Sequence, residues 1–197
     1  LFKYLKNQTL QSFEWKTRIQ ISLDVARAME YMDHKQLVHR DLRTENILLM
    51  NNDQNSELRA KLADFGLSRQ LLSESRELGH DIWQYNPPER LKENIYDIQS
   101  DVYSFGICCW EIASRKIPYE EWEESDKYFK LLPNGHKEID LFKLKRDIID
   151  GLRPGRYLID LECPAEFESL IYSCLHVSRS ERPTFAEIVS ILTSISL

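Results

Sequence analysis

An almost uninterrupted apolar stretch between Gln99 and Arg115 restricts the possible folds more than any other part of the sequence. It reads VYSFGICCWEIA over residues 102–113, so a helix here is apolar around nearly its whole circumference. Such a helix is buried on all sides. It is also too short and too interrupted to cross a bilayer. We therefore expect it to lie inside the core of a helical fold.

Two further segments have helical periodicity. Thr17 to His34 carries two apolar lines and one polar stripe at helix spacing, and Ala165 to Val177 is amphipathic. The sequence PTFAEIVSILTSI closes the chain, and Thr184 and Glu187 have the spacing of a capping box at its start. Most of the chain is therefore expected to be helical.

The strand signals are short and lie between the first two helices. QLVH, NILLM and LRAKLADFG have strand character, and the polar loop NNDQNSE separates the last two. We therefore predict a β-hairpin from Asn46 to Asp64, with a long tip. The expected fold class is α+β, mainly α-helical, with one small hairpin sheet.

Residues 120–145 are polar and charged, and they predict a surface insertion. Trp122, Tyr128 and Phe129 lie among its charges. They indicate either a docking surface or a plain solvated excursion, and the sequence leaves both open.

Composition excludes several classes of function. The chain has 197 residues and a formal net charge of -6, whereas a nucleic-acid surface needs a basic stripe. No apolar run is long enough to span a bilayer, so no membrane contact is expected from this segment. The cysteines lack metal-ligand spacing, which favours reduced thiols in a cytosolic protein; they are Cys108, Cys109, Cys163 and Cys174.

The stretch VHRDLRTEN, residues 38–46, concentrates charge at the mouth of the predicted hairpin. Folding back the hairpin brings Asn46 close to Asp64, which places two hard oxygen donors side by side. Magnesium prefers such ligands and often takes only one or two from protein. Asp41 can then accept a proton from an attacking hydroxyl, and Arg43 can face spread negative charge. This arrangement indicates in-line phosphoryl transfer.

These residues belong to a longer series of motifs. HRDLRTEN, ADFG, PPE, SDVYSFG and RP occur in this order, at compatible spacings. The series resembles the large C-terminal lobe of a eukaryotic protein kinase, and the resemblance covers nearly all of residues 1–197.

The resemblance implies roles for the charged residues at the hairpin. Asp41 would be the catalytic base, with Arg43 beside it. Asn46 and Asp64 would hold the magnesium ions that bridge the phosphates of ATP. Leu48 would form part of the floor under the adenine.

It also implies roles in the activation segment. Arg40 would pair with a phosphate there, Phe65 would pack under a helix of the other lobe, and Gly66 would let the segment turn away. Ser73 and Ser75 are either phosphorylation sites within reach of Arg40 or merely solvated serines.

Three more residues would brace the site. Glu89 would form a buried ion pair with Arg182, and Asp101 would accept hydrogen bonds from the backbone around His39 and Arg40.

The N-terminal kinase lobe has no counterpart in the sequence. A Gly-rich loop and a strand lysine are not present, and Leu1 to Leu5 resembles the first helix after the hinge. We therefore expect a fragment of a longer parent, inactive alone, whose partners are the missing lobe and a protein substrate. The parent is expected to be cytoplasmic, or on the cytoplasmic side of a membrane if it is a receptor.

The acceptor and the activity itself stay open. SDVYSFGICCWEI, DIIDGLRP and RSERPTF are most similar to the tyrosine-kinase-like group, which mainly phosphorylates Ser or Thr, although Tyr remains possible. Arg43 replaces the usual lysine, and Ile82 replaces a threonine that normally bonds the catalytic Asp. Because of Ile82, a pseudokinase that acts as a signalling scaffold remains an alternative. The PPE segment argues against a small-molecule phosphotransferase.

Overall fold

The structure is a computed structural model. It describes residues 1–7, 13–51, 57–64, 69–70, 82–123, 125–131 and 136–196.

Within these residues the fold is mainly α-helical with small antiparallel sheets, as the sequence predicts. The α-helices are α1 (Phe2–Leu5), α2 (Trp15–His34), α3 (Pro88–Glu93), α4 (Ile98–Ser114), α5 (Glu120–Glu123), α6 (Leu141–Ile149), α7 (Ala165–Cys174) and α8 (Phe185–Ser194). The strands are β1 (Leu37–Val38), β2 (Ile47–Asn51), β3 (Leu58–Leu62), β4 (Arg69–Gln70), β5 (Phe129–Leu131) and β6 (Lys137–Ile139). They pair as β1 with β4, β2 with β3, and β5 with β6.

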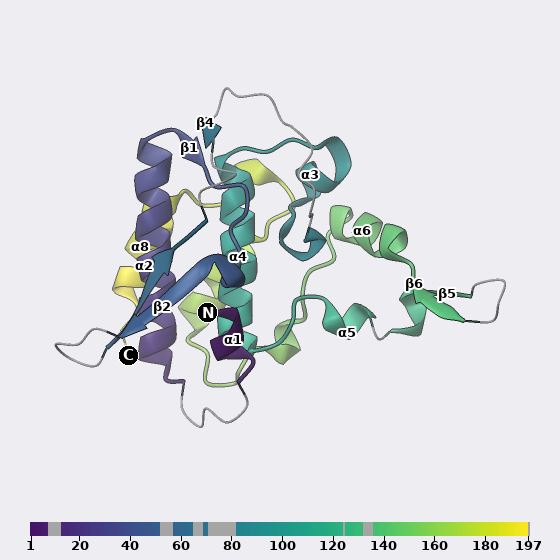
Figure 1. Ribbon diagram of the computed structural model, residues 1–197, viewed down its shortest axis with the longest axis horizontal. Coiled ribbons are helices and arrows are strands. Elements are labelled where there is room, and N and C mark those ends of the chain that lie inside the picture. Colours follow the sequence, from purple (N-terminus) through teal and green to yellow (C-terminus); the bar gives the residue numbers. More distant parts are fainter. Residues whose placement is uncertain are drawn as a thin grey trace.

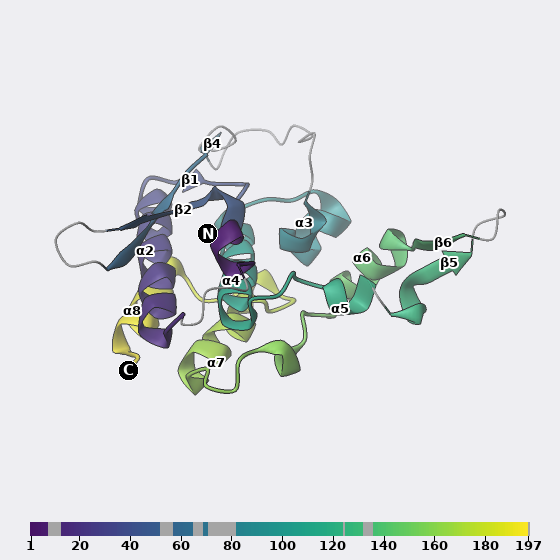
Figure 2. The same ribbon diagram turned by 60° about the horizontal axis from the view of Figure 1, so that its bottom comes forward.

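Helix α4 forms the centre of the core. Every residue from Ser100 to Ala113 is buried, which confirms the prediction made from its apolar sequence. Asp97 caps its first turn through a capping box with Ser100. Helix α7 packs directly against α4, and Figure 2 shows it on the side of α4 away from β1 and β2. Gly106 allows this close approach, because a Cβ there would lie 2.8 Å from Cys174 Cβ.

Helix α2 lies between α8 and the β2–β3 hairpin (Figure 1). The hairpin itself is expected from the sequence, and the structure pairs its strands antiparallel with Ile47 opposite Leu62. Asp24 of α2 accepts two hydrogen bonds from Arg59 of β3, at 2.8 and 2.6 Å. The predicted capping box also begins α8, where the Thr184 side chain accepts from the Glu187 amide. The bonds from Arg59 to Asp24 hold the hairpin on α2.

The predicted insertion, residues 120–145, contains α5, the β5–β6 hairpin and the start of α6. Figure 1 shows these elements extending away from the main body. Tyr128 is nevertheless fully buried, stacks edge-on against Trp122 and donates a 2.8 Å hydrogen bond to Asp147. The buried Tyr128 is therefore a packing residue and is not available as part of a docking surface. The boundaries of the insertion stay a prediction.

The described part of the chain contains no helix that is both long and apolar enough to cross a membrane. All four cysteines are free, and Cys163 alone among them is partly exposed.

Candidate active site

The loop between β1 and β2 is organised around Asp41. The Asn46 side-chain nitrogen Nδ2 donates to the Asp41 carbonyl oxygen and to Asp41 Oδ2, both at 2.8 Å. Arg43 Nε lies 3.3 Å from the other carboxylate oxygen, Oδ1. Asn46 is 8% exposed, so its side chain is held inside the loop. The three residues that the sequence predicts for catalysis are therefore in mutual contact.

The β2–β3 hairpin also places Ala63, the residue before Asp64, beside Asn46. The Ala63 amide donates to the Asn46 carbonyl at 2.8 Å, which extends the ladder one residue beyond the Ile47–Leu62 pair. Asp64 follows directly and is exposed, with a left-handed φ of 61°. Because Asn46 Nδ2 is turned toward Asp41, its Oδ1 oxygen is the atom that remains for a metal.

This donor set fits magnesium. An amide oxygen and a carboxylate are hard ligands, and magnesium commonly takes one or two ligands from protein and the rest from water and phosphates. No group of three or more His, Cys, Asp or Glu side chains suited to a metal occurs among the described residues. The described residues therefore do not form a metal site made only of such side chains.

Asp101, which lies in the core, holds the beginning of the loop between β1 and β2. It accepts hydrogen bonds from the His39 amide at 2.6 Å and the Arg40 amide at 3.0 Å, the bonds expected from the sequence. Sequence reasoning missed a third donor, the Tyr96 hydroxyl at 2.7 Å. Complete burial raises the pKa of Asp101, and these hydrogen bonds act in the opposite direction. The Asp101 carboxyl group therefore has a structural role.

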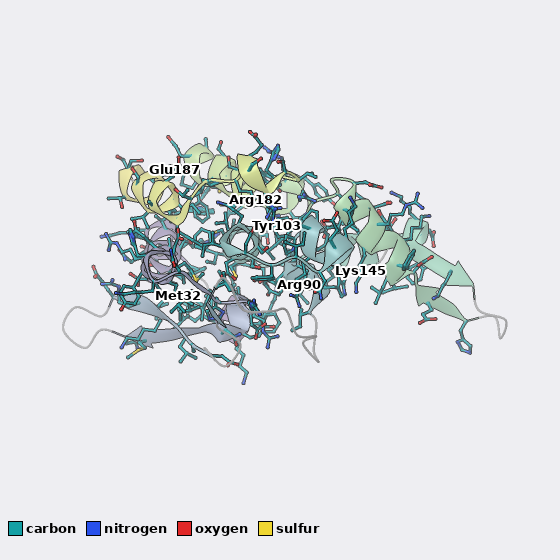
Figure 3. All side chains as sticks on the ribbon, turned by 90° about the horizontal axis from the view of Figure 1, so that it is seen from above. Met32, Arg90, Tyr103, Lys145, Arg182 and Glu187 are labelled. Carbon is teal, nitrogen blue, oxygen red and sulfur yellow. The ribbon has the colours of Figure 1, made fainter. Side chains whose placement is uncertain are left out.

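The ion pair expected between Glu89 and Arg182 is present and buried. Arg182 donates from Nη1 and Nη2 to the two Glu89 oxygens, at 2.7 and 2.8 Å. It also donates to the carbonyls of Gln99 and His176. Its guanidinium lies over the Tyr103 ring, 5.1 Å from the centroid (Figure 3). Burial acts to raise the pKa of Glu89, but hydrogen bonding and charge attraction from Arg182 outweigh it and the pKa is lowered.

Other predicted residues have mixed outcomes. Leu48 is 53% exposed on β2, opposite Lys61 on β3, so its side chain is accessible to a ligand. Arg40 is 9% exposed and has a left-handed φ of 69°. Ile82 is partly buried against the core. The remaining predicted residues lie outside the described part of the chain; they are Phe65, Gly66, Ser73 and Ser75.

Sequence reasoning missed a buried polar cluster beside the loop. The Tyr85 hydroxyl donates to Glu111 Oε2 at 2.5 Å, and the Thr44 hydroxyl donates to the same oxygen at 3.0 Å. Lys6 Nζ lies 3.8 Å from Glu111 Oε1. Burial raises the pKa of Glu111 to about 7. The available signal was a single acid inside the apolar run 102–113, because a buried carboxyl group requires partners.

Comparison with known proteins agrees with this geometry. A family model described as protein tyrosine and serine/threonine kinase matches residues 1–192. The probable serine/threonine-protein kinase roco8 of Dictyostelium discoideum is 33% identical over 96% of this chain and 9% of its own length. Cyclic GMP-binding protein C of the same organism is 34% identical over 99% of the chain and 7% of its own length.

A plant relative covers a larger share of its own sequence. The serine/threonine/tyrosine-protein kinase HT1 of Arabidopsis thaliana is 31% identical over 96% of this chain and 43% of its own length. The chain thus spans less than half of each of these three relatives. The match over residues 1–192, together with the contacts around Asp41, shows that this chain belongs to the protein tyrosine and serine/threonine kinase family.

Proposed function

We propose that this chain is the C-terminal catalytic lobe of an active protein kinase, which transfers the γ-phosphate of ATP to a protein serine or threonine. The observation that carries the proposal is the pair of hydrogen bonds from Asn46 to Asp41. They hold a carboxylate and a potential metal ligand together at the end of the β2–β3 hairpin, next to Asp64.

Each residue then has a chemical task. Asp41 orients the acceptor hydroxyl and accepts its proton, since its carboxylate is fixed by Asn46 and Arg43. Arg43 also supplies positive charge near the transferred group. Asn46 and Asp64 would hold magnesium, which neutralises the charge on the phosphates of ATP when it is bound. The exposed Leu48 would lie beneath the adenine.

The choice of serine or threonine rests on the relatives. Roco8 is described as a probable serine/threonine-protein kinase, and HT1 as a serine/threonine/tyrosine-protein kinase. We extend the serine/threonine part to this chain, and tyrosine remains the second acceptor to test.

Several proposals complete this function. The chain would need an N-terminal lobe in the same parent protein, and it would be inactive alone. The kinase domain would be partial over residues 1–197, with an insertion at 120–145, in a cytoplasmic protein. Phosphate on Ser73 or Ser75 would pair with Arg40.

One observation favours a pseudokinase scaffold as the alternative. Ile82 packs its apolar side chain against the core and has no hydroxyl group with which to bond Asp41. A scaffold would keep the fold and bind partners with little or no catalysis.

The test measures phosphate transfer by the full-length protein with magnesium, ATP and a generic protein substrate. Asp41→Asn should lower kcat by about a hundred-fold or more, because it removes the proton acceptor. Asp150→Asn is the matched control, since Asp150 is an exposed acid at the end of α6. Equal transfer by Asp41→Asn and wild type would overturn the proposal, and an inactive wild type would favour the scaffold.

A further inference from the structure

Helix α4 carries a row of buried polar side chains on an otherwise apolar surface. Asp101, Ser104 and Glu111 are separated by three and seven residues, which places them on one face of the helix. Their exposed fractions are 0%, 3% and 0%. A buried polar group without a hydrogen bond is costly. Ser104 has one acceptor within its own helix, the Ser100 carbonyl at 3.1 Å. Otherwise the three side chains depend on partners across the helix interface.

These partners lie in two segments that are distant in the sequence. Asp101 holds the amides at the start of the loop between β1 and β2, called the catalytic loop below. Ser104 Oγ donates to the Tyr85 carbonyl at 3.0 Å, and Glu111 accepts from the Tyr85 hydroxyl. Tyr85 ends the 3₁₀ turn Trp83–Tyr85, which leads into α3. Helix α4 thus holds this turn at both its backbone and its side chain.

The turn and the catalytic loop also meet directly. Tyr85 Oη and Thr44 Oγ1 lie 3.2 Å apart, and both hydroxyls bond the same Glu111 oxygen. Each hydroxyl has one proton and both donate to Glu111 Oε2, so this oxygen is the shared corner of a triangle of three groups. Thr44 is 0% exposed and Tyr85 is 7% exposed, so water does not readily replace either hydroxyl.

A short covalent path leads from this triangle to the reacting groups. Thr44 begins the 3₁₀ turn Thr44–Asn46, which is closed by the Asn46 amide bonded to the Arg43 carbonyl at 3.0 Å. Asn46 then donates twice to Asp41. A shift of Thr44 must therefore move Asn46, and with it the carboxylate that Asn46 holds.

We propose that Thr44, Tyr85 and Glu111 are positioning residues: their hydrogen-bonded triangle sets the catalytic loop so that Asp41 and Asn46 face the acceptor and the phosphates correctly. This proposal rests on the kinase function proposed above. It assigns these residues no contact with substrate. It also makes the turn before α3 a part of the support of the loop, because without Tyr85 Oη the Thr44 hydroxyl would keep only its bond to Glu111.

The experiment uses the full-length protein with magnesium and ATP. Thr44→Val and Tyr85→Phe remove one hydroxyl each at nearly constant shape, and Thr44→Ser restores the hydroxyl. Thr193→Val and Tyr172→Phe are matched controls, because their hydroxyls bond carbonyl oxygens on α8 and at Pro154, away from the loop. We measure kcat, KM for ATP, and hydrogen–deuterium exchange of residues 38–48.

We expect Thr44→Val and Tyr85→Phe to lower kcat by about ten-fold or more, since small misplacements of catalytic groups are costly. KM for ATP should change less than two-fold, roughly, because the loss affects transfer more than binding. Amide exchange in residues 38–48 should rise in both variants and stay at the wild-type rate in Thr44→Ser and in both controls.

Two outcomes overturn the positioning role. One is wild-type kcat and wild-type exchange in both hydroxyl-deleted variants. The other is an equal loss in the controls, which would indicate general destabilisation. If the wild-type protein transfers no phosphate, the kinase proposal fails, and the exchange measurement alone still decides whether the triangle orders the loop.

Discussion

The buried Glu89–Arg182 pair and the exposed Asp97–Arg179 pair offer a controlled comparison within one structure. The two have nearly equal closest N–O distances, 2.7 and 2.8 Å. Their environments differ, since the Arg182 side chain is 0% exposed and the Arg179 side chain is 47% exposed. We change each arginine to methionine, which keeps most of the apolar volume and removes the charge.

The expected costs follow from burial. Arg182→Met leaves the Glu89 carboxylate without its cation and deprives the Gln99 and His176 carbonyls of a donor. Breaking a buried pair in this way costs about 3–5 kcal/mol of unfolding free energy. Arg179→Met should cost less than about 1 kcal/mol, because water screens an exposed pair. The first loss is a large fraction of a typical stability of about 5–15 kcal/mol.

Equilibrium urea unfolding, followed by tryptophan fluorescence, measures both values. The double variant Glu89→Gln/Arg182→Met removes the stranded charge as well, so it should be more stable than Arg182→Met alone. Equal costs for the two arginine variants would refute the reasoning from burial. A double variant less stable than Arg182→Met would refute the account of a stranded carboxylate.

Two other predictions concern the core around α4. Burial raises the pKa of Glu111 from 4.5 to about 7, so the folded state binds a proton more tightly than the unfolded state. The contribution of Glu111 to stability is present near pH 4 and is lost as the pH rises through 7, a loss of about 3 kcal/mol. Urea unfolding at pH 5 and 8 measures this dependence of stability on pH, and Glu111→Gln should remove it. A wild-type slope in that variant would assign the effect to other groups. Gly106→Ala gains up to about 1 kcal/mol of helix propensity. Because its Cβ would lie 2.8 Å from Cys174 Cβ, the overpacking cost of about 1–3 kcal/mol should prevail and lower the Tm in calorimetry; a raised Tm would contradict it.

Local patterns in the sequence predict much of this fold. The apolar run 102–113 marks the central helix, and strand character on both sides of a polar loop predicts the β2–β3 hairpin. The spacing of Thr184 and Glu187 predicts a cap that the structure contains. These features succeed because each depends on residues close together in the chain.

The features that sequence reasoning missed join residues far apart. The triangle of Thr44, Tyr85 and Glu111 connects positions separated by up to 67 residues, and no periodicity reveals such a contact. Tyr128 lies in a strongly charged stretch, yet it is buried against Trp122. In both cases tertiary packing decides the environment of the side chain, and local composition does not.

The left-handed backbone at Arg40 and Asp64 has a consequence for attempts to stabilise this protein. Their φ angles are 69° and 61°, values at which glycine meets no steric penalty and a larger residue does. A selection for thermal resistance alone would therefore tend to replace both residues by glycine or asparagine. Such a selection would discard the guanidinium and the carboxylate together, so any library aimed at robustness should keep these two codons constant.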